Sequence, residues 1–127
     1  MKEWYLVVSR TTDPSELAAE FVAAGLEAFV PHRSRARTQL EALFPGHVFV
    51  AADPDVDRLA LAGGDWDFHF VTNDRNRRMS MPADLVGALR DRDDETGQFL
   101  RSEIGAMAPE YRIEFLIGQL HRWRSAR

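Results

Sequence analysis

The first thirty residues pass from a β-like pattern to a helical one and back. Residues 4–9 (WYLVVS) are mostly aromatic and β-branched, which predicts a strand. Asp13 precedes a proline and a run of apolar residues at helical spacing, so a helix capped by Asp13 should end near Gly25. Residues 26–31 (LEAFVP) predict a second short strand that ends at its proline.

Residues 43–50 (LFPGHVFV) are the most strongly marked stretch of the chain. The proline and glycine predict a tight turn, and the four residues after them predict a short apolar strand. Apolar residues on both faces indicate a strand that is covered on both sides, or covered on one side with the other kept for a partner. The polar, arginine-bearing residues 32–42 before it predict a loop or a hairpin arm.

The next forty residues predict a further strand between two helices. A short helix is expected at 53–63, a half-buried alternating strand at 66–72, a polar loop at 73–80 and a helix at 82–90. The resulting order predicts an α+β fold, with an antiparallel four-stranded sheet flanked by helices in a ferredoxin-like arrangement.

The remaining residues predict a helical tail on that fold. We expect one domain over 1–90, a charged linker over 91–97 and a helical tail over 98–127, with its main helix at 109–124. An apolar stripe on that helix must be buried against the first ninety residues or another chain. The stripe consists of Ile113, Leu116, Ile117, Leu120 and Trp123.

Composition narrows the possible classes of protein. The chain has 127 residues, a net charge of −4 and no cysteine, which excludes disulfides and thiolate metal sites. We expect a cytoplasmic protein that does not enter a membrane, because no apolar run approaches a membrane span and no signal sequence is present. The four histidines are scattered and nucleotide-binding fingerprints are absent, so we expect no enzyme activity, no cofactor and no metal.

Four features of the sequence occur in order: the opening Trp4-Tyr5 pair, the capped helix, the strand ending at Pro31 and the LFPGHVFV stretch. Together they resemble the N-terminal domain of the NusG family of transcription elongation factors. The spacing is most similar to the RfaH-like specialised branch, and the resemblance covers about residues 2–90. Members usually add a small β-barrel, the KOW domain. No run of alternating strands follows Arg90 in this chain, so that domain is not expected here.

The resemblance implies a transcription elongation or antitermination factor that suppresses pausing or termination. Its partner would be RNA polymerase, and the contact would be made at the clamp helices of the largest catalytic subunit. The resemblance also implies that the protein is a monomer when it is not bound to polymerase. The implied apolar contact surface consists of Val8, Phe44, Pro45, Phe49, Val86 and Leu89. Plain core packing is the alternative for Phe44 and Phe49, because alternation along a strand sends some apolar side chains inward.

The resemblance also implies non-template DNA as a second partner, with Arg10 at a basic position of the first strand. Glu16 and Glu20 stand where the RfaH-like branch has basic side chains, so sequence-specific DNA reading is not implied. The branch contacts the second polymerase lobe through small hydroxyl residues, and the matching positions here are Arg58, Leu59 and Ala60. Other loop arginines predict a separate basic patch or, alternatively, a solvated surface: Arg33, Arg35, Arg37, Arg75, Arg77 and Arg78.

Two further alternatives concern the tail and the function as a whole. The tail stripe either masks the polymerase-binding surface or packs elsewhere and replaces lost core. The alternative function is a ferredoxin-like interaction or ligand-sensing module, dimeric in one version, that does not act in transcription.

Overall fold

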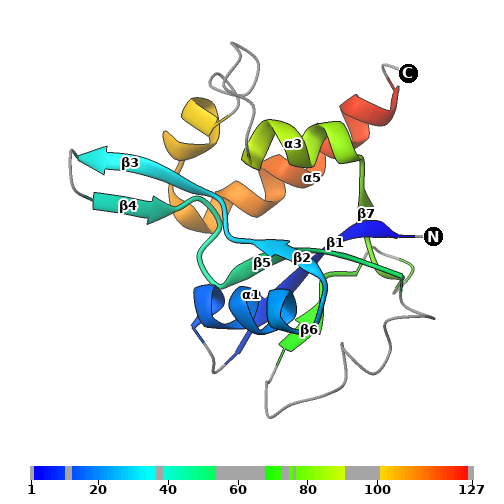
Figure 1. Cartoon of the computed structure of the whole chain (residues 1–127). Helices are drawn as coiled ribbons and strands as arrows, with labels where there is room; N and C mark the ends of the chain where they lie inside the picture. The colour runs from blue at the N-terminus through cyan, green and yellow to red at the C-terminus, as the bar shows by residue number, and fades with distance from the viewer. Residues whose placement is uncertain are drawn as a thin grey trace. The chain divides into compact units, whose positions relative to one another are not determined.

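The computed structural model describes residues 2–10, 13–36, 39–53, 68–72, 75, 77–90 and 101–125 (Figure 1). The fold is α+β with antiparallel sheets. The strands are β1 (Glu3–Ser9), β2 (Glu27–Phe29), β3 (His32–Ala36), β4 (Gln39–Ala42), β5 (His47–Ala52), β6 (Phe68–Phe70) and β7 (Ser80–Met81). The helices are α1 (Pro14–Ala23), α3 (Ala83–Arg90) and α5 (Pro109–Ser125), and residues 101–105 are also helical.

The chain forms two compact units that interleave along the sequence. Unit 1 contains Met1–Val30 and Gly46–Met81, and unit 2 contains Pro31–Pro45 and Pro82–Arg127. Each passage from one unit to the other occurs at a proline, whose ring restricts the backbone at that point. The C-terminal tail therefore shares a unit with the β3–β4 hairpin and with α3.

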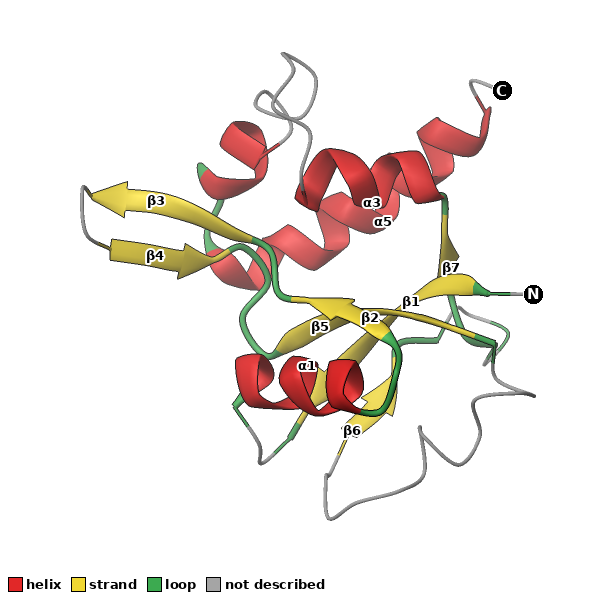
Figure 2. Ribbon diagram, in the orientation of Figure 1, coloured by secondary structure: helices red, strands yellow, loops and turns green. Residues whose placement is uncertain are grey.

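Unit 1 is built on an antiparallel sheet with the order β2-β5-β1-β6, and the short β7 also pairs with β1 (Figure 2). The sequence predicted four strands, and the structure adds Ser80–Met81, which lies at the end of the predicted polar loop. The two signature stretches are direct neighbours, because Tyr5 lies opposite Val50 and Leu6 lies opposite Phe49.

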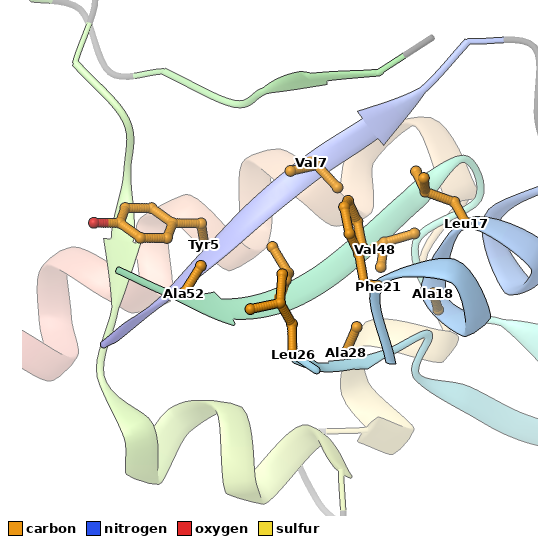
Figure 3. Close-up of a cluster of buried hydrophobic side chains, with 10 residues drawn as sticks. Tyr5, Val7, Leu17, Ala18, Phe21, Leu26, Ala28, Val48 and Ala52 are labelled. Carbon is orange, nitrogen blue, oxygen red and sulfur yellow. The ribbon is translucent and has the colours of Figure 1, made fainter. Parts of the chain in front are cut away.

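One face of the sheet packs against α1 and forms the core of unit 1. Figure 3 shows Leu17 and Phe21 of α1 directed toward Val7 of β1 and Val48 of β5. The predicted helix limits are confirmed: the Asp13 carboxylate accepts a 2.8 Å hydrogen bond from the Ser15 amide, and Gly25, just past the helix, has φ +94°. The buried core residues are Tyr5, Val7, Leu17, Ala18, Phe21, Leu26, Ala28, Val48, Val50 and Ala52.

The opposite face of this sheet carries a row of aromatic rings. Alternation along the strands turns Trp4 and Phe49 away from α1. The Phe29 ring stacks on Phe49 with centroids 5.3 Å apart, and Trp4 meets Phe29 edge-on at 5.6 Å. Such contacts stabilise each ring pair by about 0.5–1.5 kcal/mol beyond the burial of apolar area.

Unit 2 combines a hairpin with the C-terminal helices. β3 and β4 pair antiparallel with an irregularity between Ser34 and Ala36, which confirms the hairpin interpretation of residues 32–42 (Figure 2). The predicted helix at 82–90 is observed as α3, and that at 109–124 as α5. The predicted helix after Asp53 and the linker 91–97 lie outside the described residues.

None of the helices in the described part of the chain combines the length and the apolar character needed to cross a membrane.

Candidate binding surfaces

The turn before β5 determines how the signature strand enters the sheet. Gly46 has φ +82°, a conformation that favours glycine, and its carbonyl accepts a 2.8 Å hydrogen bond from the Ser9 amide. This bond fixes the start of β5 against the end of β1. Val8 therefore lies opposite His47, and the apolar residues of both strands keep a single register.

The six residues predicted to contact polymerase are divided between the two units. Val8 and Phe49 belong to unit 1, and the other four belong to unit 2. Val8 is half-buried and Pro45 is exposed. The other four residues are buried: Phe44 and Phe49 are 0% exposed, and Val86 and Leu89 are 1% exposed.

The burial of Phe44 and Phe49 agrees with the core-packing alternative for these two residues. A partner can reach them only after a change that exposes them. In the conformation described, Val8 and Pro45 supply the accessible part of the predicted surface.

Val8 lies between two histidines that are far apart in sequence. It is opposite His47 on β5 and opposite His69 on β6, so the three side chains form a row on the face away from α1. His69 is exposed, and its Nδ1 accepts a 3.1 Å hydrogen bond from Nε of Arg10.

The predicted basic residues do not form one group within a single unit. Arg10, Arg75, Arg77 and Arg78 are exposed members of unit 1. The Arg78 guanidinium lies over the Phe70 ring, 4.4 Å from its centroid. The hairpin arginines belong to unit 2: Arg33 and Arg35 are on β3, and Arg37 lies outside the described residues, as do Arg58, Leu59 and Ala60.

The two carboxylates that weigh against DNA reading are at the surface. Glu16 and Glu20 are both exposed on α1. A phosphate backbone passing this helix would meet negative charge. The exposed arginines of unit 1 lie elsewhere, directly after β1 and in the loop after β6.

Arg112 is a buried charged residue that the sequence analysis missed. It is the largest fully buried side chain among the described residues, with 2% exposure. Its guanidinium donates to four backbone carbonyls at 3.1–3.2 Å, namely those of Ala42, Leu43, Gly105 and Met107. Arg112 thereby joins α5 to the end of β4 and to the helical segment before α5.

The tail helix buries a stripe that differs from the predicted one by the addition of Arg112. Arg112, Leu116 and Leu120 are buried at four-residue spacing, and Ile113 and Ile117 are half-buried. The side chain of Trp123 lies outside what the structure describes. The sequence left open whether this helix docks on the first ninety residues or on another chain, and the bonds to Ala42 and Leu43 are contacts of the first kind.

Two chemical features complete the description. Burial raises the pKa of the Tyr5 hydroxyl, and a 3.0 Å hydrogen bond to the Glu3 carboxylate acts in the same direction. Within the described ranges, no group of three or more metal-ligating side chains is placed to hold a metal ion.

No model of a known protein family matches the chain, and no curated protein matches it closely enough to serve as a relative.

Proposed function

We propose that this chain is a transcription elongation or antitermination factor that binds the clamp helices of the largest catalytic subunit of RNA polymerase. The observation that carries the proposal is the pairing of its two signature stretches. Tyr5 of the opening Trp-Tyr pair lies opposite Val50, and Leu6 lies opposite Phe49. The order β2-β5-β1-β6, with α1 on one face, supports the ferredoxin-like arrangement of a NusG-family N-terminal domain.

The proposed surface is apolar and rich in aromatic residues, as expected for recognition of a helical partner. Large rings at the centre of such an interface supply most of the binding free energy. Val8 and Pro45 offer the first contacts because both are accessible. Phe44, Phe49 and their buried neighbours join the interface only if binding exposes them.

The most direct mutational test uses a charge at Val8. Val8→Glu should weaken binding to core RNA polymerase by about tenfold or more, because an unpaired carboxylate would be buried in the interface. Val22→Glu is the matched control, since Val22 is 55% exposed on α1 and lies outside the proposed surface. Both variants keep the full chain, and circular dichroism checks that each is folded.

Equal binding by the two variants, or no binding by the wild type, contradicts the proposal. Substitution of Phe44 or Phe49 is a poorer test. Each is fully buried, so a loss of binding could result from unfolding alone.

The tail is proposed to regulate this surface by masking it. Supporting observations lie within unit 2, where α5 shares a compact unit with the buried Phe44, Val86 and Leu89. A chain truncated after Arg90 should bind polymerase more tightly if it stays folded. Unchanged binding by a folded truncated chain would favour the alternative, in which α5 replaces lost core.

The burial of Phe44 and Phe49 specifically favours a second candidate, a ferredoxin-like interaction or ligand-sensing module outside transcription. In this case the two rings are core residues and do not take part in binding another protein. Light scattering of the purified chain distinguishes the candidates, because a tight dimer that fails to bind polymerase favours the module. A monomer that binds polymerase favours the factor.

A further inference from the structure

Helix α5 has an outer face that lies opposite the side it buries. The buried residues recur at four-residue spacing and share one side of the helix: Arg112, Leu116 and Leu120. The helical repeat places Tyr111, Glu114 and Gly118 on the other side, which we call the outer face of α5. The guanidinium of Arg112 is turned inward, so its charge does not contribute to this face.

The outer face combines an exposed aromatic ring with free space. Tyr111 is 60% exposed, and it and Val22 are the two exposed large apolar side chains in the described part of the chain. Phe115, one turn after Tyr111, is half-buried at the edge of the same face. Gly118 has open space where a Cβ would stand. Because the side chains at a crossing point set the distance between two helices, a glycine there permits close approach.

The charges along α5 change sign from its first half to its second. Glu110 and Glu114 are exposed in the first half, and the sequence places Arg122 and Arg124 in the second half. Two identical helices that cross antiparallel at Gly118 bring the acidic half of each onto the basic half of the other. A parallel pair brings like charges together, which is unfavourable.

We propose that the outer face of α5 is a self-association surface, on which a second copy of this chain docks antiparallel through its own α5. A two-fold axis at Gly118 makes the contact self-complementary, as in other symmetric dimers. Tyr111 and Phe115 of each copy supply the apolar part, and the opposite charges determine the direction. The inference goes beyond the proposed function and differs from the monomer that the family resemblance implies.

The size of the outer face predicts a weak dimer. With 17 residues, α5 is about 25 Å long and about 10 Å wide. One such face buries far less than the roughly 800 Å² per partner of a standard stable interface. We therefore expect a dissociation constant of about 10–100 μM for the wild type.

Sedimentation equilibrium of the full chain, from tenfold below to tenfold above that constant, is the first measurement. Gly118→Gln should weaken self-association about tenfold or more, because a side chain at the crossing point separates the two helices. Gly87→Gln is the matched control. Gly87 is also half-buried in a helix with open space at its Cβ, but it lies on α3, so dimerisation should be unchanged. Urea unfolding checks that both variants are folded.

A charge exchange tests the antiparallel arrangement. One variant carries Glu110→Arg with Glu114→Arg, and the other carries Arg122→Glu with Arg124→Glu. Each variant alone should be monomeric at concentrations where the wild type is dimeric, because like charges meet along both halves of the pair. An equimolar mixture should form a heterodimer, since opposite charges face each other again. An effect of the substitutions on folding alone would not be reversed by mixing.

Several results would overturn the inference. They are a wild type that stays monomeric at the highest concentration, equal dimerisation by Gly118→Gln and Gly87→Gln, and a mixture of folded charge variants that forms no heterodimer. If a charge variant fails to fold, the glycine pair decides alone. A monomeric wild type whose polymerase binding is weakened by Gly118→Gln would assign the outer face to a different partner. The sedimentation assay contains no polymerase, so its failure is distinct from failure of the Val8 test.

Discussion

Replacing Arg112 with methionine should destabilise the protein more than the same substitution at Arg101. Methionine fills a similar length of side chain but leaves the carbonyls of Ala42, Leu43, Gly105 and Met107 without their guanidinium donors. These four groups come from two segments of unit 2, the end of β4 and the residues just before α5. The substitution therefore removes the polar link between α5 and the end of β4.

The magnitude follows from two opposing terms. A hydrogen bond to a charged group contributes about 1.5–3 kcal/mol, so four such bonds total about 6–12 kcal/mol. Burying the guanidinium costs several kcal/mol, which the substitution recovers. We expect a net loss of about 3 kcal/mol in the free energy of unfolding. Arg112→Lys should lose at least half as much, because a single ammonium nitrogen cannot reach all four carbonyls.

Urea unfolding followed by circular dichroism measures this loss. With a slope of about 1.5 kcal/mol per molar urea, the Arg112→Met midpoint should fall by about 2 M. Arg101→Met is the matched control, since Arg101 is half-buried in the same unit and donates at 2.7 Å to the Ala88 carbonyl. Its cost should be about 1 kcal/mol. Equal losses for the two variants would refute the reasoning.

Three further predictions test local features. Asp13→Ala removes the cap of α1 and should lower the free energy of unfolding, measured with urea, by about 1 kcal/mol. An unchanged free energy of unfolding would show that the hydrogen bond from the Ser15 amide to the Asp13 carboxylate does not stabilise the helix. Gly46→Ala should lower the free energy of unfolding by about 1–2 kcal/mol, because Gly46 has a φ of +82°. Gly87→Ala should raise it by about 0.5–1 kcal/mol, because Gly87 lies within α3 and has open space where a Cβ would stand. A change of the same sign in the free energy of unfolding for both variants would contradict this. Tyr5 should ionise above its ordinary pKa of 10.0, so the stability it contributes is present below pH 10 and is lost as pH rises through the raised pKa. Absorbance titration of wild type against Tyr5→Phe isolates the ionisation of Tyr5, and a midpoint at or below pH 10 would contradict the prediction.

Local patterns in the sequence were sufficient to predict most elements. The cap at Asp13 and the glycine at 25 mark both ends of α1, because the groups that end a helix lie within a few residues of it. The proline-glycine turn and the β-branched residues after it mark β5 for the same reason. β7 was missed because two residues carry no readable alternation, and only pairing with β1 makes Ser80–Met81 a strand.

The candidate sites were predicted less completely because their geometry depends on residues distant in sequence. Arg112 looks like a solvated helix residue, but its acceptors at Ala42 and Leu43 are 70 and 69 residues away. Similarly, nothing near Arg10 indicates that His69 will hold it, since the contact follows from the register of β1 and β6. The apolar residues at 86 and 89 were recognised, but their complete burial follows from tertiary packing.

The most direct test of the proposed function is site-specific photo-crosslinking to core RNA polymerase. A crosslinking side chain replaces Val8 in one full-length variant and Val22 in another, and mass spectrometry locates the products. We expect crosslinks from position 8 to the clamp helices of the largest catalytic subunit, and none from position 22. Failure to crosslink that subunit from position 8, or equal crosslinking from both positions, would contradict the account.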